Sequence, residues 1–320
     1  AKLLVLRATV LRDVAQAYYN VLRAEQSVEV LRNSLAVQEE RVRDIRGRQR
    51  AGVARPLDVS LIESQAAETR TTLIRALRDV ENARSILSFL IDADARDGAL
   101  TDKFDLPVDA PSLEQFFQLA LAQRQDLLAA IANIDAARRA VDEAVGQYYP
   151  SVSLDVDYFL SRQSTPTESD WSALLRANLP IFSAGRIQAD VRTAWSRLHQ
   201  AALAENLTRR QVIQDVEVAY QNVASSGETL AELQVQLAAQ QEALRQAEAS
   251  YNAGLGTNLE RLVAQDALLT TQLELANEQY DQKVFYLNLQ RAAGRLGTDP
   301  ATPLVVAPTT RVSDDAHVHR

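Results

Sequence analysis

The 320-residue chain contains no cysteine and no methionine, and only 10 glycines and 9 prolines. The absence of cysteine excludes disulfide bonds, thiolate metal sites and cysteine nucleophiles from this sequence. So few glycines and prolines cannot supply the turns of a protein built from many short strands. No apolar run approaches the roughly 20 residues of a transmembrane helix, and no signal peptide is visible. Ala, Leu, Gln, Glu and Arg fill most positions, which predicts long helices.

Residues for catalysis or nucleic-acid binding are also scarce. The net charge is −8 and no basic tract occurs, so we expect no nucleic-acid partner. The 3 histidines are His199, alone in a helical pattern, and His317 and His319 near the C-terminus. No serine–histidine–aspartate order, phosphate loop or metal-ligand spacing is present. The sequence therefore predicts no enzyme, no cofactor and no metal site.

A duplication relates the two ends of the chain. Val14 and Val216 lie in similar segments 202 residues apart. The same offset, without a gap, aligns further identical residues: Leu31 with Leu233, Gly52 with Gly254, Leu57 with Leu259, and Asp79 with Asp281. Generic coiled-coil similarity is the alternative, but it would not keep one register past a glycine-containing break. Extending the offset predicts that roughly 80 residues are missing upstream, so we expect the chain to be N-terminally incomplete.

Each repeat has the plan of an antiparallel helical hairpin. Apolar residues recur at seven-residue spacing, which is typical of a supercoiled helical seam. We expect residues 5–51 and 57–92 to form one hairpin, and residues 186–252 and 258–296 the other. Gly52 and Gly254 suit the left-handed residue that ends a helix, and Pro56 suits the first position of the next helix. Thr257 and Glu260 have the spacing of a capping box.

The middle of the chain has a different pattern. Gly98–Ser112 lacks periodicity and predicts a connector, followed by helices over Leu113–Gln123 and Asp126–Gly146. Two runs of about ten residues, 152–161 and 171–179, then alternate apolar and polar side chains, as strands of a transmembrane barrel do. A soluble hairpin with one buried face is the alternative. A lone hairpin between long helices has little core to pack against, whereas closure into a barrel would remove its exposed edges.

Several of these segments resemble the TolC-like outer-membrane efflux proteins, also called outer membrane factors. The resemblance runs from about residue 5 to 297 and depends on the order and spacing of these motifs: Gln125–Ala130 (QDLLAA), Tyr149–Leu154 (YPSVSL), Leu179–Arg186 (LPIFSAGR) and Tyr251–Gly254 (YNAG). It implies a mainly α fold of duplicated antiparallel coiled-coil hairpins plus a two-stranded segment of a trimeric transmembrane β-barrel. The segments expected on this basis are hairpin 1–92, connector 93–123, helix 124–147, strand pair 148–184, hairpin 185–297 and tail 298–320.

The resemblance also implies a function. Members of the family are passive export conduits of tripartite efflux or type I secretion systems. We therefore expect a homotrimer in the outer membrane and periplasm of a Gram-negative-type bacterium. Its expected partners are a periplasmic adaptor (membrane fusion protein), an inner-membrane pump or ABC transporter, and outer-membrane lipid. A structural coiled-coil scaffold and a periplasmic adaptor-like hairpin protein are the alternatives.

Three groups of site residues follow from the resemblance. Acidic residues beside the turns narrow the periplasmic aperture in the family, and the matching aperture or gating positions are Asp58, Glu260, Tyr251 and Arg55. The hairpin tips expected to contact the adaptor are Gly52, Val53, Ala54, Gly254, Leu255 and Gly256. The residues expected to face the barrel lumen are Asp155, Asp157 and Arg176.

The aperture assignment has a competing interpretation. Asp58 and Glu260 lie in first helical turns, where carboxylates favourably cap a helix, so they could serve as caps alone. Well-known family members carry an arginine tether two residues after the turn glycine, where this chain has Gly256. Arg55 in the first repeat is the candidate substitute. Asp155, Asp157 and Arg176 could likewise be ordinary solvated strand residues.

Overall fold

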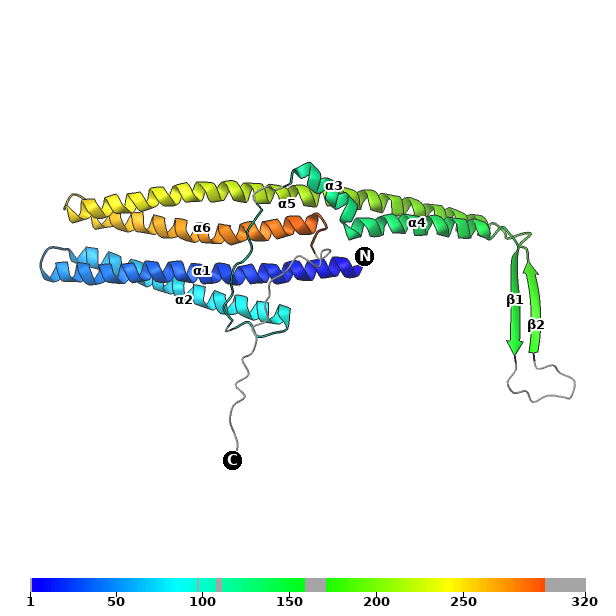
Figure 1. Ribbon diagram of the computed structural model, residues 1–320, viewed down its shortest axis with the longest axis horizontal. Coiled ribbons are helices and arrows are strands. Elements are labelled where there is room, and N and C mark those ends of the chain that lie inside the picture. Colours follow the sequence, from blue (N-terminus) through cyan, green and yellow to red (C-terminus); the bar gives the residue numbers. More distant parts are fainter. Residues whose placement is uncertain (1, 97, 108–110, 159–170, 297–320) are drawn as a thin grey trace, which may run out of the picture. The chain divides into compact units, whose positions relative to one another are not determined.

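The computed structural model describes residues 2–96, 98–107, 111–158 and 171–296. These residues form helices and one strand pair, and none of the described helices is long and apolar enough to cross a membrane. In chain order the elements are α1 (Lys2–Arg50), α2 (Pro56–Ile91), α3 (Leu113–Gln123), α4 (Gln125–Gly146), β1 (Ser151–Tyr158), β2 (Trp171–Asn178), α5 (Arg186–Asn252) and α6 (Asn258–Ala292) (Figure 1).

The elements divide into two compact units. The strand unit comprises Gln125–Val212, and the hairpin unit comprises the described residues of Lys2–Arg124 and those from Ile213 to residue 296. Helix α5 therefore contributes residues to both units. Each unit is described separately below.

The hairpin unit contains two antiparallel helix pairs, α1 with α2 and α5 with α6 (Figure 1). Arg46 pairs with Glu63 at 2.8 Å across the first pair. Gln236 donates to Thr271 at 3.1 Å across the second. The turns of both pairs lie at the same end of this unit, as the duplication predicts (Figure 1). A buried apolar cluster joins the pairs near that end and consists of Ile45, Val59, Ile62 and Leu262.

The described residues of the connector between α2 and α3 lie outside helices and strands, and side chains satisfy several of their main-chain groups. Tyr18 donates to the oxygen of Thr101 at 2.8 Å and accepts from its N–H at 3.1 Å. Lys283 donates to the oxygen of Phe104 at 2.7 Å and pairs with Asp102. Polar main-chain groups outside helices and strands need such partners where water is excluded. The connector is therefore fixed against α1 and α6 by specific polar contacts.

The strand unit contains α4, the first part of α5, and the antiparallel pair β1–β2. Val141, Ala144 and Ala194 form its small buried cluster between the two helices. Every residue of both strands is exposed. The strand pair consequently has no hydrophobic core of its own within the described residues.

The mainly α fold class expected from the sequence is confirmed, with duplicated hairpins and one strand pair. Each described strand has eight residues. The expected continuation of the first strand over residues 159–161 lies outside the described residues, as does the expected tail 298–320. The six segments proposed as domains remain a prediction.

Candidate functional site at the hairpin tips

The two hairpin turns have the same main-chain geometry. Gly52 and Gly254 adopt φ of 73° and 74°, in the left-handed region that glycine tolerates without a Cβ penalty. The next residues, Val53 and Leu255, each donate an N–H to a carbonyl five residues back, at 2.9 Å in both turns. This pairing closes the last turn of α1 and of α5 in a Schellman-type motif. The predicted glycine caps are thus confirmed, and the 202-residue offset persists in three dimensions.

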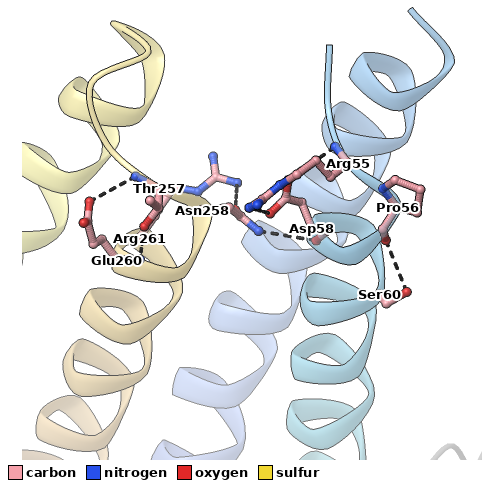
Figure 2. Close-up of polar contacts among 8 residues, drawn as sticks. All are labelled: Arg55, Pro56, Asp58, Ser60, Thr257, Asn258, Glu260 and Arg261. Atoms are coloured by element: carbon pink, nitrogen blue, oxygen red, sulfur yellow. Dashed lines mark hydrogen bonds and ion pairs between the residues drawn. The ribbon is translucent and has the colours of Figure 1, made fainter. Parts of the chain in front are cut away.

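Asp58 lies in the first turn of α2 and is bound to Arg55. Its carboxylate accepts from Nε and Nη2 of Arg55, both at 3.0 Å, and from the Arg55 main-chain N–H at 3.3 Å (Figure 2). These hydrogen bonds from Arg55 lower the pKa of Asp58 below its ordinary 3.8. Asp58 is buried, whereas the Arg55 side chain is 70% exposed. Arg55 therefore neutralises the acid of its own turn.

Glu260 occupies the equivalent position in α6 but has a different environment. The hydroxyl of Thr257 accepts from the Glu260 N–H at 3.3 Å, and the Glu260 carboxylate accepts from the Thr257 N–H at 3.0 Å. This is the capping box that the sequence predicts, and it is drawn in Figure 2. Glu260 is exposed and forms no ion pair within the described residues. The two aperture candidates are therefore a buried, paired acid and an exposed, unpaired one.

A buried hydrogen-bond chain joins the two tips. Asn258 donates through Nδ2 to the main-chain oxygen of Asp58 at 3.3 Å, and its Oδ1 accepts from Nη2 of Arg261 at 2.9 Å (Figure 2). Asn258 and Arg261 are buried. Because water is largely excluded there, loss of either partner would leave a polar group unsatisfied. This chain connects the first turn of α6 to that of α2.

Tyr251 is packed against two cationic side chains. The guanidinium of Arg261 lies 4.3 Å from the ring centroid and that of Arg48 lies 5.4 Å from it, both within cation–π range. Burial lowers the pKa of Arg261 below its usual value. Arg48 belongs to α1 and Arg261 to α6, so the aromatic ring also links the two hairpins. The predicted site residue Tyr251 thus contacts side chains from both hairpins.

Further polar contacts extend this junction along the helices. Arg41 of α1 forms an ion pair with Glu248 of α5, and Gln65 of α2 donates to Asp266 of α6 at 3.3 Å. Burial lowers the pKa of Arg41, and the nearby Arg261 acts in the same direction. The hairpin tips are consequently held together by polar contacts as well as by the apolar cluster around Ile45.

Sequence reasoning did not single out Asn258, Arg261 or Arg41, although the duplication carries a signal for them. The offset pairs Asn258 with Pro56, Arg261 with Val59, and Arg41 with Ala243. At each of these positions a polar residue in one copy replaces an apolar or non-donating residue in the other. Such departures mark where two similar hairpins contact each other.

Gly256 lies where the family tether would place an arginine. A Cβ at this position would meet Cβ of Ser250 at 3.0 Å and the main-chain N of Tyr251 at 3.2 Å. A larger residue would therefore require its neighbours to shift by a few tenths of an ångström. In this chain, Arg261 and Arg48 contact Tyr251 instead, and Arg55 is bound within its own turn.

The strand register places the expected lumen residues on one face. Ser153 pairs with Arg176, and Asp155 with Leu174, so side chains of alternate residues share that face. Asp155 and Arg176 approach to 4.0 Å diagonally across it. The opposite face carries the apolar residues Val152, Leu154, Val156, Tyr158, Trp171, Ala173, Leu175 and Ala177. The strand pair is therefore two-faced, as the alternation predicts.

No group of three or more His, Asp or Glu side chains in the described part of the chain is placed to hold a metal ion. The site consists of two equivalent turns, their carboxylates, and the polar junction between them. Together with the strand pair, these features define the TolC-like class of fold.

A crystal structure of a membrane protein from Pseudomonas aeruginosa matches with a TM-score of 0.81 at 24% identity, over 91% of this chain and 67% of the other. The outer membrane protein VceC from Vibrio cholerae matches with a TM-score of 0.78 at 22% identity, over 91% and 71%.

The sequence comparisons identify the family. Residues 116–295 match the model of the outer membrane efflux protein family, and the chain belongs to this family. It is 26% identical over 300 residues to the outer membrane efflux protein BepC of Brucella suis. That match includes 90% of this chain but 64% of BepC, so the chain spans less than two thirds of this relative's length.

Proposed function

We propose that this chain forms part of a passive export channel in the outer membrane of a Gram-negative-type bacterium. In this proposal three copies assemble around one axis, the hairpin units line a periplasmic tunnel, and the strand pairs contribute to a single barrel. The channel would serve a tripartite efflux or type I secretion system. The observation that carries the proposal is an exposed, two-faced strand pair inserted between duplicated helical hairpins.

The strand pair supports the barrel component of this proposal. One face is apolar and the other bears Asp155, Asp157 and Arg176, yet all of its residues are exposed. An isolated two-stranded ribbon is marginally stable in water because it has no core and two free edges. Pairing with strands of other copies would satisfy the edges, while lipid and an aqueous lumen would each cover the matching face. A coiled-coil scaffold would have no use for such a ribbon.

The hairpin tips support the aperture component. In a trimer, Asp58 and Glu260 would each occur three times near the axis and attract cations. Asp58 is neutralised by Arg55, whereas Glu260 has no basic partner among the described residues. We therefore assign most of the aperture's negative field to Glu260 and a mainly structural role to Asp58. The turns themselves would contact a periplasmic adaptor, which connects the channel to an inner-membrane pump or ABC transporter.

The proposal can be tested with the full-length protein encoded by the gene. We expect it to fractionate with the outer membrane, to elute in detergent with the mass of three chains, and to restore dye efflux to a strain lacking its own channel. Restoration should require a matching adaptor and pump, because the channel supplies no energy. Recovery as a soluble periplasmic protein without detergent would contradict the channel and favour a scaffold.

A further inference from the structure

Each hairpin tip carries an apolar ridge at the same repeat positions. Ridge 1 consists of Val53, Leu57 and Leu61, and ridge 2 consists of Leu255, Leu259 and Val263; the members of each are four residues apart. Val53 is 77% exposed and Leu255 87% exposed, while Leu57 and Leu259 are both 57% exposed. Contiguous apolar side chains that remain exposed in a folded unit mark a binding surface. The two ridges are thus equivalent candidates for contact with a partner.

The charges around the two ridges differ sharply. Four arginines surround the first turn, at positions 46, 48, 50 and 55, and their repeat counterparts are Glu248, Ser250, Asn252 and Thr257. Three of these arginines pair with acids of their own hairpin: Arg46 with Glu63, Arg48 with Asp44, and Arg55 with Asp58. Arg50 has no acidic partner among the described residues; its Nε contacts the main-chain oxygen of Arg46 at 3.4 Å.

After this pairing, the two tips differ in net charge. Counting the four arginines with their three acids, the first tip carries one excess positive charge. The counterparts of those acids are Gln246, Glu260 and Gln265, so the same seven positions of the second tip carry two negative charges. Of these, Glu248 pairs with Arg41 of α1, and Glu260 has no ion pair among the described residues. The guanidiniums remain available for a partner, since the side chains of Arg46 and Arg55 are 57% and 70% exposed. Among the described residues, the two tips therefore present similar apolar residues, with an exposed unpaired arginine at the first and an exposed unpaired carboxylate at the second.

The proposed function already places the periplasmic adaptor at the tips; we propose that the first tip, unlike the second, selects an adaptor surface bearing carboxylates. This inference depends on the proposed function, which supplies the adaptor as partner. Complementary charges raise association rates and exclude wrong partners more than they raise affinity. The arginines of the first tip would thus determine which adaptor surface meets which hairpin.

The shape of the ridges favours a protein helix over a lipid surface as the occupant. The second and third residues of each ridge lie about 6 Å apart along the helix, and the first residue lies in the turn before it. A helix lying alongside would cover this length, whereas a flat membrane surface would touch only the end of the turn. An anionic membrane would also favour cations at both tips, and none of the four counterparts of the first tip's arginines is a cation.

The test compares equivalent substitutions at the two tips of the full-length channel. Binding of each purified periplasmic adaptor of the source bacterium is measured at low and high salt. Leu57→Ser and Leu259→Ser should each weaken binding about tenfold, because each removes exposed apolar contact area. Arg50→Glu should weaken binding about fivefold at low salt, and high salt should abolish most of that effect. The matched control Asn252→Glu should change binding less than about twofold.

The outcomes separate this inference from the proposed function. Equal effects of Arg50→Glu and Asn252→Glu, with both serine variants weakened, would overturn the charge selection and leave docking at the tips intact. If no adaptor bound the wild-type channel, the proposed function itself would be contradicted. Dissociation of the trimer by Arg50→Glu would reassign the arginines to contacts between copies. Arg50-dependent binding to phosphatidylglycerol vesicles, without an effect on adaptor binding, would assign them to lipid and overturn the inference.

Discussion

Asn258 of the second hairpin donates a 3.3 Å hydrogen bond to the main-chain oxygen of Asp58 in the first hairpin. The same side chain accepts from Arg261, whose guanidinium lies over the ring of Tyr251. One buried amide thus connects the start of α2 with the start of α6 (Figure 2). Arg261 extends the connection to Tyr251 at the end of α5. Since the main-chain oxygen of Asp58 cannot be altered by substitution, Asn258 is the residue through which this junction can be tested.

Replacing Asn258 with alanine should loosen the junction between the hairpins. The change removes the partner of two buried polar groups, and an unsatisfied buried group costs about 1–3 kcal/mol. We expect faster hydrogen exchange in residues 56–62 and 258–265, together with a lower melting temperature. Asn252→Ala, at the exposed end of α5, is the control and should leave exchange in these segments unchanged. Equal exchange in both variants would show that the apolar cluster alone holds the tips together.

Neutralising the two aperture acids should have unequal effects. Glu260→Gln removes an exposed carboxylate without a basic partner, so it should reduce cation preference in single-channel recordings of the full-length trimer. Asp58→Asn removes a carboxylate already neutralised by Arg55, so its effect on selectivity should be small and its effect on stability larger. Gln can still accept from the Thr257 N–H, which preserves the cap. Unaltered cation preference in Glu260→Gln would leave that residue as a cap alone.

The Arg55–Asp58 pair should make the first tip sensitive to acid. The hydrogen bonds from Arg55 lower the pKa of Asp58 below 3.8, so the folded state binds the proton less readily than the unfolded state. The resulting stabilisation is present above about pH 3.8 and is lost as the pH falls through the lower, folded-state pKa. Thermal melting should therefore separate wild type from Arg55→Gln at neutral pH, and the two curves should converge below pH 3.8. A difference that is independent of pH would mean that Arg55 acts through packing.

A carboxylate introduced on the apolar face of the strand pair should block assembly, whereas one introduced on the polar face should be tolerated. Val156 pairs with Ala173 on the apolar face, and Ser153 pairs with Arg176 on the polar face. Val156→Asp would place a carboxylate against lipid at a cost on the order of 2 kcal/mol per copy, and should block assembly in the outer membrane. Ser153→Asp would lie opposite Arg176 and should be tolerated. Equal amounts of assembled trimer for both variants would contradict the barrel.

The local features of this protein could be predicted from its sequence because each depends on a few neighbouring residues. Gly52 and Gly254 terminate helices because the left-handed conformation costs glycine little, and Thr257 with Glu260 begins one because both groups lie within reach along the chain. The alternation in Val152–Asp157 determined which strand residues share a face, since the side-chain period of a strand is two. The offset between Gly52 and Gly254 likewise predicted two hairpins with equivalent turns.

The different environments of the two aperture acids required the tertiary structure. Sequence reasoning treated Asp58 and Glu260 as equivalent, but Asp58 is buried and paired, whereas Glu260 is exposed and capping. The contacts of Asn258 with Asp58 and of Arg41 with Glu248 span about 200 residues of chain, and no local rule sets the distance between the hairpins. That distance follows from how two similar helix pairs pack, and departures from the repeat decide which polar groups become buried there.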